Sequence, residues 1–243
     1  MPLPSWPVRP ADRSASGLDS VGAALGYRHT DDPFASVPVA RRALRIGLCS
    51  SLSWGFLRDL IRCVRAEPDA STLSFLEATP HGVLQAARRG QVDVGFVYGA
   101  HNWARLEYED LWREPLMVLM PDHHPLAGDS EVSALALRKE TFLVAGDPAE
   151  CELQRALLQQ AIGGIGPPIL AVPVERATMF DLVSLGVGLA LTTGSALGAF
   201  HPGVTYRPIA APSPPVAFHA VWRLSNRNED LSRFLDTARA HAA

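Results

Sequence analysis

The chain has 243 residues, of which 47% are hydrophobic and 19% charged, and its formal net charge is −3. This composition is typical of a globular protein, and the length suffices for one large domain or two small lobes with cores of their own. The slightly negative charge argues against a globally basic surface for nucleic acid. Cys49, Cys63 and Cys151 have no metal-ligand spacing, which favours free thiols in a reducing compartment.

Residues 1–43 are rich in proline and predict a largely irregular tail with at most one short helix near Leu18–Leu25. The first ten residues lack the apolar segment of a secretory signal. An uncharged stretch, Leu182–Phe200, approaches the length of a membrane span, but its glycines favour a helix end, a buried strand and a helix start. We therefore expect a cytoplasmic protein with no membrane partner.

From Leu44 onward, short apolar runs alternate with amphipathic runs, as in a βαβαβ unit. Such a unit builds a parallel sheet, and open parallel sheets bind small ligands at the carboxyl ends of their strands. Thr79 and Pro80 are typical of a helix start, and Gly90 of a helix end. The predicted strands are Leu44–Leu48, Leu73–Leu76 and Val92–Val97, and the predicted helices are Trp54–Glu67 and Pro80–Gly90.

A second unit of the same kind follows, after an extended segment from Leu106 to Met120. Extended chain is again predicted at Val216–Arg223, before a last helix capped by Asn228. Two such units with long connectors indicate two lobes around a cleft. The second unit comprises strands at Phe142–Ala145, Leu170–Val174 and Leu189–Leu191, a helix from Asp147-Pro148 to about Ala161 with Leu153, Ala156 and Leu157 inward, and a helix Met179–Leu185 capped by Thr178.

Four motifs in this order resemble the effector-binding domain of LysR-type transcriptional regulators: Leu44–Gly47, Gly90–Phe96, Glu114–Ala127 and Leu182–Leu191. The resemblance covers about four-fifths of the chain. It implies an α/β, type II periplasmic-binding-protein-like fold, with two Rossmann-like lobes, two crossover strands and an effector in the cleft. The implied limits are residues 44–117 with 210–243 for lobe 1 and 118–209 for lobe 2.

The chain departs from the family pattern in one respect. A LysR-type regulator carries a winged helix-turn-helix and a linker helix before this domain, whereas only about forty residues, broken by prolines, precede Leu44. We therefore expect no direct DNA binding by this chain alone. It would act as a homo-dimer or in a hetero-oligomer with a full-length LysR-type regulator. A non-functional remnant and a misassigned start codon are the alternatives.

Candidate effector-binding residues follow the predicted strands. Small hydroxyl side chains and free amides at a helix start favour an anion such as a carboxylate, but the same residue types also cap helices, so both interpretations stay open. The resemblance places Thr79 at a position that touches the effector and puts Ala145, Gly146 and Thr178 on the opposite side of the cleft. The candidate residues are Ser50, Ser51, Ser53, Thr79, Ala145, Gly146, Thr178 and Thr192.

Motifs for other functions are missing from the sequence. The histidines lack zinc-site spacing, no Gly-x-Ser-x-Gly motif marks a hydrolase, and no phosphate-binding glycine loop occurs. Cys49 is best interpreted as a small buried side chain, and thiol sensing is not expected with Cys151 alone in the second lobe. We expect a ligand sensor in transcription regulation, not an enzyme, without cofactor or metal. The alternative is a solute-binding protein of a transport system.

Overall fold

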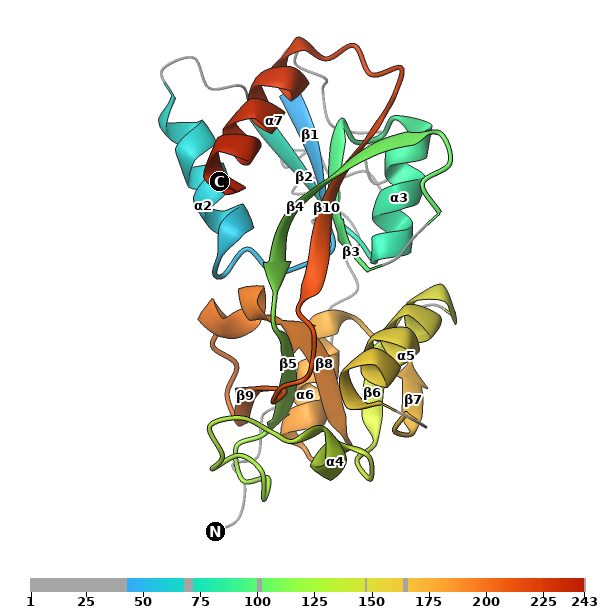
Figure 1. Ribbon diagram of the computed structural model, residues 1–243, viewed down its shortest axis with the longest axis vertical. Helices are drawn as coiled ribbons and strands as arrows, with labels where there is room; N and C mark the ends of the chain where they lie inside the picture. The colour runs from blue at the N-terminus through green and yellow to red at the C-terminus, as the bar shows by residue number, and fades with distance from the viewer. Residues whose placement is uncertain (1–42, 68–71, 100–101, 147, 164–165, 243) are drawn as a thin grey trace, which may run out of the picture. The chain divides into compact units, whose positions relative to one another are not determined.

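A computed structural model of the protein describes residues 43–67, 72–99, 102–146, 148–163 and 166–242 (Figure 1). The predicted tail and its short helix lie outside the described residues, as does Asp147. The elements are β1 (Ala43–Leu48), α2 (Phe56–Ala66), β2 (Thr72–Glu77), α3 (Pro80–Arg89), β3 (Val94–Tyr98), β4 (Leu106–Glu114), β5 (Leu116–Pro121), α4 (Ala134–Leu137), β6 (Phe142–Ala145), α5 (Pro148–Ile162), β7 (Ile169–Val172), α6 (Arg176–Ser184), β8 (Leu189–Thr193), the 3-10 helix η1 (Gly194–Gly198), β9 (Val204–Pro208), β10 (Val216–Arg223) and α7 (Glu229–Ala242).

The first sheet has the strand order β2-β1-β3-β10-β4. Strand β1 runs parallel to β2 and β3, whereas β10 runs antiparallel to β3 and β4. Helices α2 and α7 pack on one face and α3 on the other, as Figure 1 shows. Phe96 and Val97 are both fully buried and belong to the clusters on opposite faces, because a parallel strand between two helical layers has apolar side chains on both faces.

The second sheet has the order β7-β6-β8-β5-β9. Strand β6 is parallel to β7 and β8, and β5 is antiparallel to β8 and β9. Val118 and Met120 belong to the apolar cluster that contains α5, and Leu119 belongs to the cluster that contains α6. Since successive side chains of a strand point to opposite faces, α5 and α6 cover opposite faces of this sheet.

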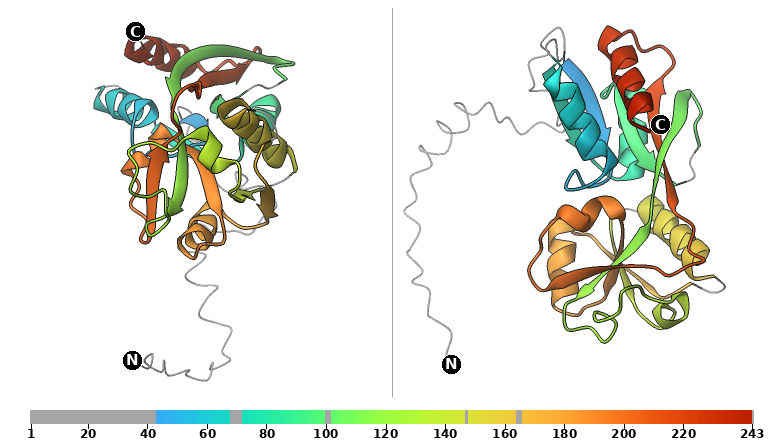
Figure 2. Two further views of the ribbon diagram at one scale, coloured as in Figure 1. Left: turned by 60° about the horizontal axis from the view of Figure 1, so that its bottom comes forward. Right: turned by 60° about the vertical axis from the view of Figure 1, so that its left-hand side comes forward.

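The chain crosses between the two sheets twice, as the right-hand view in Figure 2 shows. Strand β4 continues through Pro115 into β5, and β9 is followed by β10 in the first sheet. Helix α7 packs against α2 and the first sheet. The predicted crossovers and the return of the C-terminal helix are therefore confirmed. The predicted lobe limits stay a prediction, and β5, which begins at Leu116, lies in the second sheet.

Helix ends test the capping predictions. Thr79 Oγ1 accepts a hydrogen bond from Gly82 N at 3.2 Å, Gly90 ends α3 with φ 71°, and Asn228 Oδ1 accepts from Asp230 N at 3.1 Å. These three predictions are confirmed. The predicted cap at Thr178 is wrong, because α6 begins at Arg176 after Glu175, which leaves Thr178 exposed in the first turn.

The uncharged stretch Leu182–Phe200 contains the end of α6, strand β8 and η1, as predicted. Among the described residues, no helix is both long enough and apolar enough to cross a membrane.

Asp93, directly before β3, ties three segments of the first lobe together. Its carboxylate accepts hydrogen bonds from Arg45 N, Nε and Nη2 at 2.9, 3.0 and 2.9 Å, and its carbonyl accepts one from Asn226 Nδ2 at 2.9 Å. Burial alone would raise the pKa of this carboxyl, but the hydrogen bonds and the charge of Arg45 outweigh it and lower the pKa below the ordinary 3.8.

Replacing Asp93 by Asn should lower the free energy of unfolding at pH 7 by about 1–3 kcal/mol, because a charge-assisted bidentate pair is lost. Since the folded-state pKa is lowered, this contribution is present above pH 3.8 and is lost as the pH falls through the folded-state value. Urea unfolding of the parent protein and of Asp93→Asn, from pH 7 to strongly acid pH, should show that their free energies of unfolding converge as the pH falls. Asp59→Asn, in a solvent-exposed pair with Arg62, is the control; an equal loss in the control would contradict the prediction.

Candidate functional site

A cavity of about 740 Å³ lies where the carboxyl ends of strands from both sheets meet the starts of their helices. Its volume is in the range of small-molecule sites. The first sheet contributes Cys49, Ser50, Ser51, Glu77, Ala78, Thr79, Pro80 and Tyr98, and the second contributes Leu143, Val144, Gly146, Glu150, Gln154, Val174, Glu175, Arg176, Ala177, Met179, Phe180, Leu191, Thr192, Thr193 and His201.

Most of the candidate effector-binding residues are brought together at this cavity. Five of the eight line it, namely Ser50, Ser51, Thr79, Gly146 and Thr192. Ser53 and Thr178 are not among the lining residues, and Ala145 is placed only as the last residue of β6. The part that each of these residues plays toward an effector stays a prediction.

The serines after β1 do not cap the first helix. Gly55 is the N-cap of α2, has φ 80°, and no side chain caps this end. Ser51 Oγ instead donates to Ser53 Oγ at 2.8 Å. Ser50 Oγ is different, because it is buried at the cavity wall and has no hydrogen-bond partner among the described residues. Ser50 is only 7% exposed, so its hydroxyl is a buried polar group that a ligand can satisfy.

Ser53 and Arg176 are among the residues that hold the lobes together around the cavity. Ser53 Oγ donates to the carbonyl of Ser195 in η1 at 2.7 Å, and a Cβ at Gly198 would overlap the carbonyl of Ser53. Arg176 Nη2, at the start of α6, donates to the carbonyl of Cys49 at 2.9 Å, and Arg176 Nη1 lies 3.6 Å from Glu77 Oε1. The contact of Arg176 with Cys49, which directly follows β1, favours a start of α6 before the predicted Met179, since a tertiary contact can outweigh a local capping preference.

A buried polar group on α5 forms part of the wall. Glu150 Oε1 accepts hydrogen bonds from Gln154 Nε2 at 3.0 Å and from Tyr98 Oη at 3.4 Å, and Gln154 Nε2 also lies 3.2 Å from Tyr98 Oη. Glu150, Gln154 and Tyr98 are 6%, 9% and 8% exposed. Burial, followed by the charge of Glu150, raises the pKa of Tyr98 well above its ordinary value. Tyr98 therefore stays a neutral hydrogen-bond donor.

Sequence reasoning missed this group because it assigned the inward face of α5 only in part. Leu157 is buried and Leu153 packs against the core, as predicted, whereas Ala156 is exposed. The buried face is Glu150, Gln154, Leu157, Leu158, Ala161 and Ile162. These positions follow helical spacing, and the polar pair extends the apolar stripe toward the helix N-terminus. Polar residues in register with an apolar stripe were the available signal.

Cys49 lines the cavity and is 1% exposed. Burial raises the pKa of its thiol far above the ordinary value, so the thiol stays protonated and is a poor nucleophile. Its interpretation as a small buried side chain is confirmed. Among the described residues, no group of three or more His, Cys, Asp or Glu side chains is placed to hold a metal ion.

The chain is similar in sequence to transcriptional regulators. It is 27% identical over 197 residues to the Hca operon transcriptional activator HcaR of Escherichia coli (strain K12), covering 80% of this chain and 66% of that protein. It is 27% identical over 176 residues to the regulator XapR of the same organism, covering 68% of this chain and 56% of that protein. The chain thus spans less than two-thirds of the length of these relatives.

Solved structures share the fold. The BenM effector-binding domain with its effector benzoate matches with a TM-score of 0.67 and 23% identity, over 82% of this chain and 90% of that chain. CbnR, a LysR family transcriptional regulator, matches with a TM-score of 0.69 and 18% identity, over 94% of this chain and 75% of that chain. The fold is therefore of the type II periplasmic-binding-protein type that the sequence predicts.

The family described as LysR substrate binding domain matches residues 39–243. This range includes both sheets, both crossings and every residue that lines the cavity. The chain therefore belongs to the family of LysR substrate-binding domains.

Proposed function

We propose that the domain is a cytoplasmic sensor that binds a small organic acid in the cavity between its two sheets. The observation that carries this proposal is Ser50, which lines the cavity and whose buried hydroxyl has no hydrogen-bond partner among the described residues. Thr79 lies beside it at the start of α3, where the helix dipole favours an anion. Arg176 adds a positive charge to the same cavity.

The contacts that join the lobes supply a means of signalling. Ser53 and Arg176 bond to the opposite lobe through backbone carbonyls, which requires the lobes to be close together. A molecule that touches Ser50 and Thr79 on one side and Thr192 on the other binds the closed arrangement better than an open one. Differential affinity of this kind shifts the population toward closure.

We propose that this shift acts in transcription regulation through a partner. The partner is a second copy of the chain or a full-length LysR-type regulator, and the chain need not contact DNA directly. Support comes from the curated relatives, which are transcriptional regulators. The roles of these relatives also favour this function over a solute-binding protein of a transport system, the second candidate. In-frame coding DNA upstream separates the two, since a helix-turn-helix or a signal sequence would each be recognisable there.

Replacing Thr79 by Val should weaken the binding of the acid that the panel below identifies by about 1–3 kcal/mol. Replacing Ser50 by Ala should weaken it by about 1 kcal/mol, because each change removes a hydrogen bond to a buried ligand group. The measurement is thermal unfolding against a panel of aliphatic and aromatic carboxylates, with titration calorimetry of the strongest. Lost capping at Thr79 lowers the Tm of the free protein, whereas a lost ligand contact lowers only the increment that the acid produces.

Thr178→Val is the matched control, since Thr178 is exposed and outside the cavity lining. It should bind the same acid with unchanged affinity. Equal affinity in the Thr79 and Ser50 variants would show that the acid does not bind at these residues.

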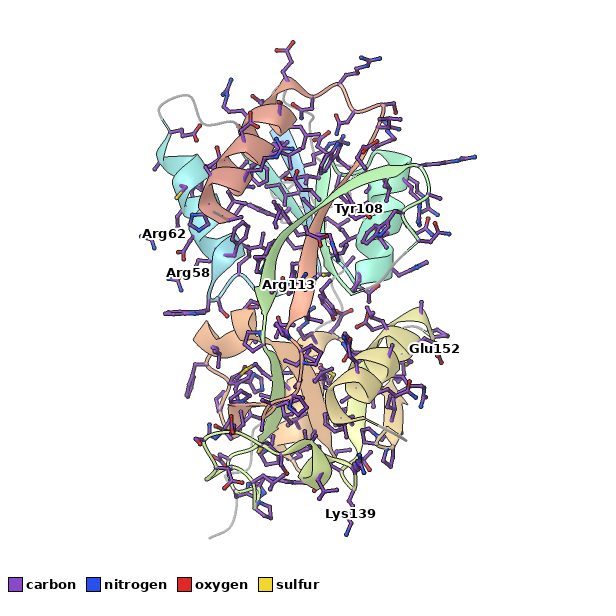
Figure 3. All side chains as sticks on the ribbon, viewed as in Figure 1. Arg58, Arg62, Tyr108, Arg113, Lys139 and Glu152 are labelled. Carbon is purple, nitrogen blue, oxygen red and sulfur yellow. The ribbon has the colours of Figure 1, made fainter. Side chains whose placement is uncertain are left out.

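We further propose a dimer in which α2 of one protomer packs against α5 of its partner. Trp54, before α2, is 59% exposed, and Arg58 and Arg62 extend outward from α2 in Figure 3. A large exposed aromatic beside one charged helix face is typical of a contact surface. The same face would serve in a hetero-oligomer.

Reversing the charge at Arg62 with Arg62→Glu should convert a dimer into monomers, because like charges or an unpaired charge would be buried in the contact. Sedimentation velocity of the purified chain provides the measurement. Lys139→Glu, at an exposed position of the second lobe away from α2 (Figure 3), makes the same charge change and should leave the dimer intact. If the Arg62→Glu variant sediments like the parent protein, the interface lies elsewhere.

A further inference from the structure

We propose that Arg176 binds the carboxylate of the effector and that Glu77 competes with the effector for this arginine. Binding exchanges an ion pair between the two lobes for an ion pair between the protein and its ligand. The inference rests on the proposed function. It adds one residue that binds the acid and one residue that limits the affinity for the acid.

The first argument is the position of Arg176. This residue begins α6 in the second lobe, and its Nη2 donates a hydrogen bond to the carbonyl of Cys49 in the first lobe at 2.9 Å. The next residue along the chain is Ser50, which lines the cavity with a buried hydroxyl that has no hydrogen-bond partner among the described residues. A guanidinium and a hydroxyl are both donors to a carboxylate. Arg176 is therefore held one residue away from the serine that carries the proposed function.

The second argument is the charge of Arg176. Among the described residues that line the cavity, it is the one arginine or lysine. Burial raises the pKa of the Cys49 thiol, and the charge of Arg176 counteracts part of that rise. The arginine side chain is 40% exposed, so water and salt screen its charge less than that of a fully solvated side chain. Its guanidinium is the permanent positive charge that an acid meets in the cavity.

The third argument is the weakness of the ion pair with Glu77. Arg176 Nη1 lies 3.6 Å from Glu77 Oε1, which is longer than a charge-assisted hydrogen bond of about 2.7–2.9 Å. The side chain of Glu77 is 66% exposed, and solvent-exposed ion pairs contribute little to stability. Glu77 is the last residue of β2 and also lines the cavity. Its carboxylate can therefore turn into solvent while the carboxylate of a ligand takes its place.

The exchange does not require the lobes to separate. The hydrogen bond to the carbonyl of Cys49 uses Nη2, whereas Nη1 is the nitrogen next to Glu77. A guanidinium has five N–H donors in a planar fork, so Arg176 can keep the carbonyl and give up Glu77. The effector then occupies the partner position of Glu77, and Glu77 remains nearby as a competitor that lowers the affinity.

The test uses two acids and their neutral amides, namely 3-phenylpropanoate, 3-phenylpropanamide, 4-methylpentanoate and 4-methylpentanamide. Each compound is titrated into the full chain at pH 7 by calorimetry, alongside thermal unfolding. The variants are Arg176→Gln, Glu77→Gln and the double variant that carries both changes. The matched control is Glu175→Gln, because Glu175 is an exposed carboxylate of the same cavity wall and its side chain does not cap α6.

At least one acid should bind the parent about tenfold or more tightly than its amide. Arg176→Gln should lose about the same factor for the acid and little for the amide, whereas a merely structural role of Arg176 would weaken both alike. Far-ultraviolet circular dichroism and the free-protein Tm establish that each variant is folded.

Glu77→Gln should bind the acid about three- to fivefold more tightly than the parent, because the weak ion pair no longer has to be broken. Glu175→Gln removes the same charge from the cavity wall without removing that ion pair, and should gain less than about twofold. The double variant should show no gain over Arg176→Gln, because the effect of Glu77 acts through the arginine.

The outcomes separate this inference from the proposed function. If an acid binds the parent but Arg176→Gln changes neither the acid nor the amide, or weakens both alike, the inference is wrong and the organic-acid proposal stands. If the gain in Glu77→Gln is absent, is matched by Glu175→Gln or persists in the double variant, Glu77 does not compete for Arg176 and the inference is overturned. If neither acid binds the parent or the Glu77→Gln variant, the inference is overturned, and the wider carboxylate panel decides the proposed function separately.

Discussion

Glu114 is the residue on which the arrangement of the two sheets depends. It ends β4, and only Pro115 separates it from β5 in the other sheet. Its buried carboxylate accepts one hydrogen bond from Trp112 Nε1 in the first sheet and another from Ser195 N in η1 of the second, both at 2.8 Å. A buried charge is stable when charge-assisted hydrogen bonds surround it. This carboxylate therefore fixes the direction in which the chain leaves one sheet and enters the other.

The cavity follows from that orientation. Parallel strands end at the same edge of a sheet, and the crossing turns these two edges toward each other. Residues that follow strands, such as Ser50, Thr79 and Gly146, are then brought to one place from distant parts of the sequence. Helix starts lie at the same edges, so unpaired amides and capping hydroxyls accompany them. The polar chemistry of the site is a product of topology and of a few short side chains.

The sequence predicted those features that local patterns determine. Apolar runs located the strands, and Thr79, Gly90 and Asn228 marked helix ends because capping depends on residues close in sequence. Prediction failed where distant residues decide the structure. Helix α6 begins at Arg176 and not at the predicted Met179. Arg176 donates a hydrogen bond to the carbonyl of Cys49, which is 127 residues away in sequence. The spacing within α5 could have indicated that Glu150 and Gln154 are buried, but it could not identify Tyr98 as their hydrogen-bond partner.

The position of β10 has a consequence for how the protein is made. In the first sheet β10 lies between β3 and β4, although it is synthesised about a hundred residues after β4. The second sheet, by contrast, is built entirely from β5 to β9, a continuous stretch of chain. Non-local pairings form slowly because they first require closure of a long loop. On the ribosome, the second lobe can therefore complete its sheet before β10 has been synthesised and can pair with β4. The early strands of the first lobe meanwhile depend on protection from chaperones or from the packing of α2 and α3.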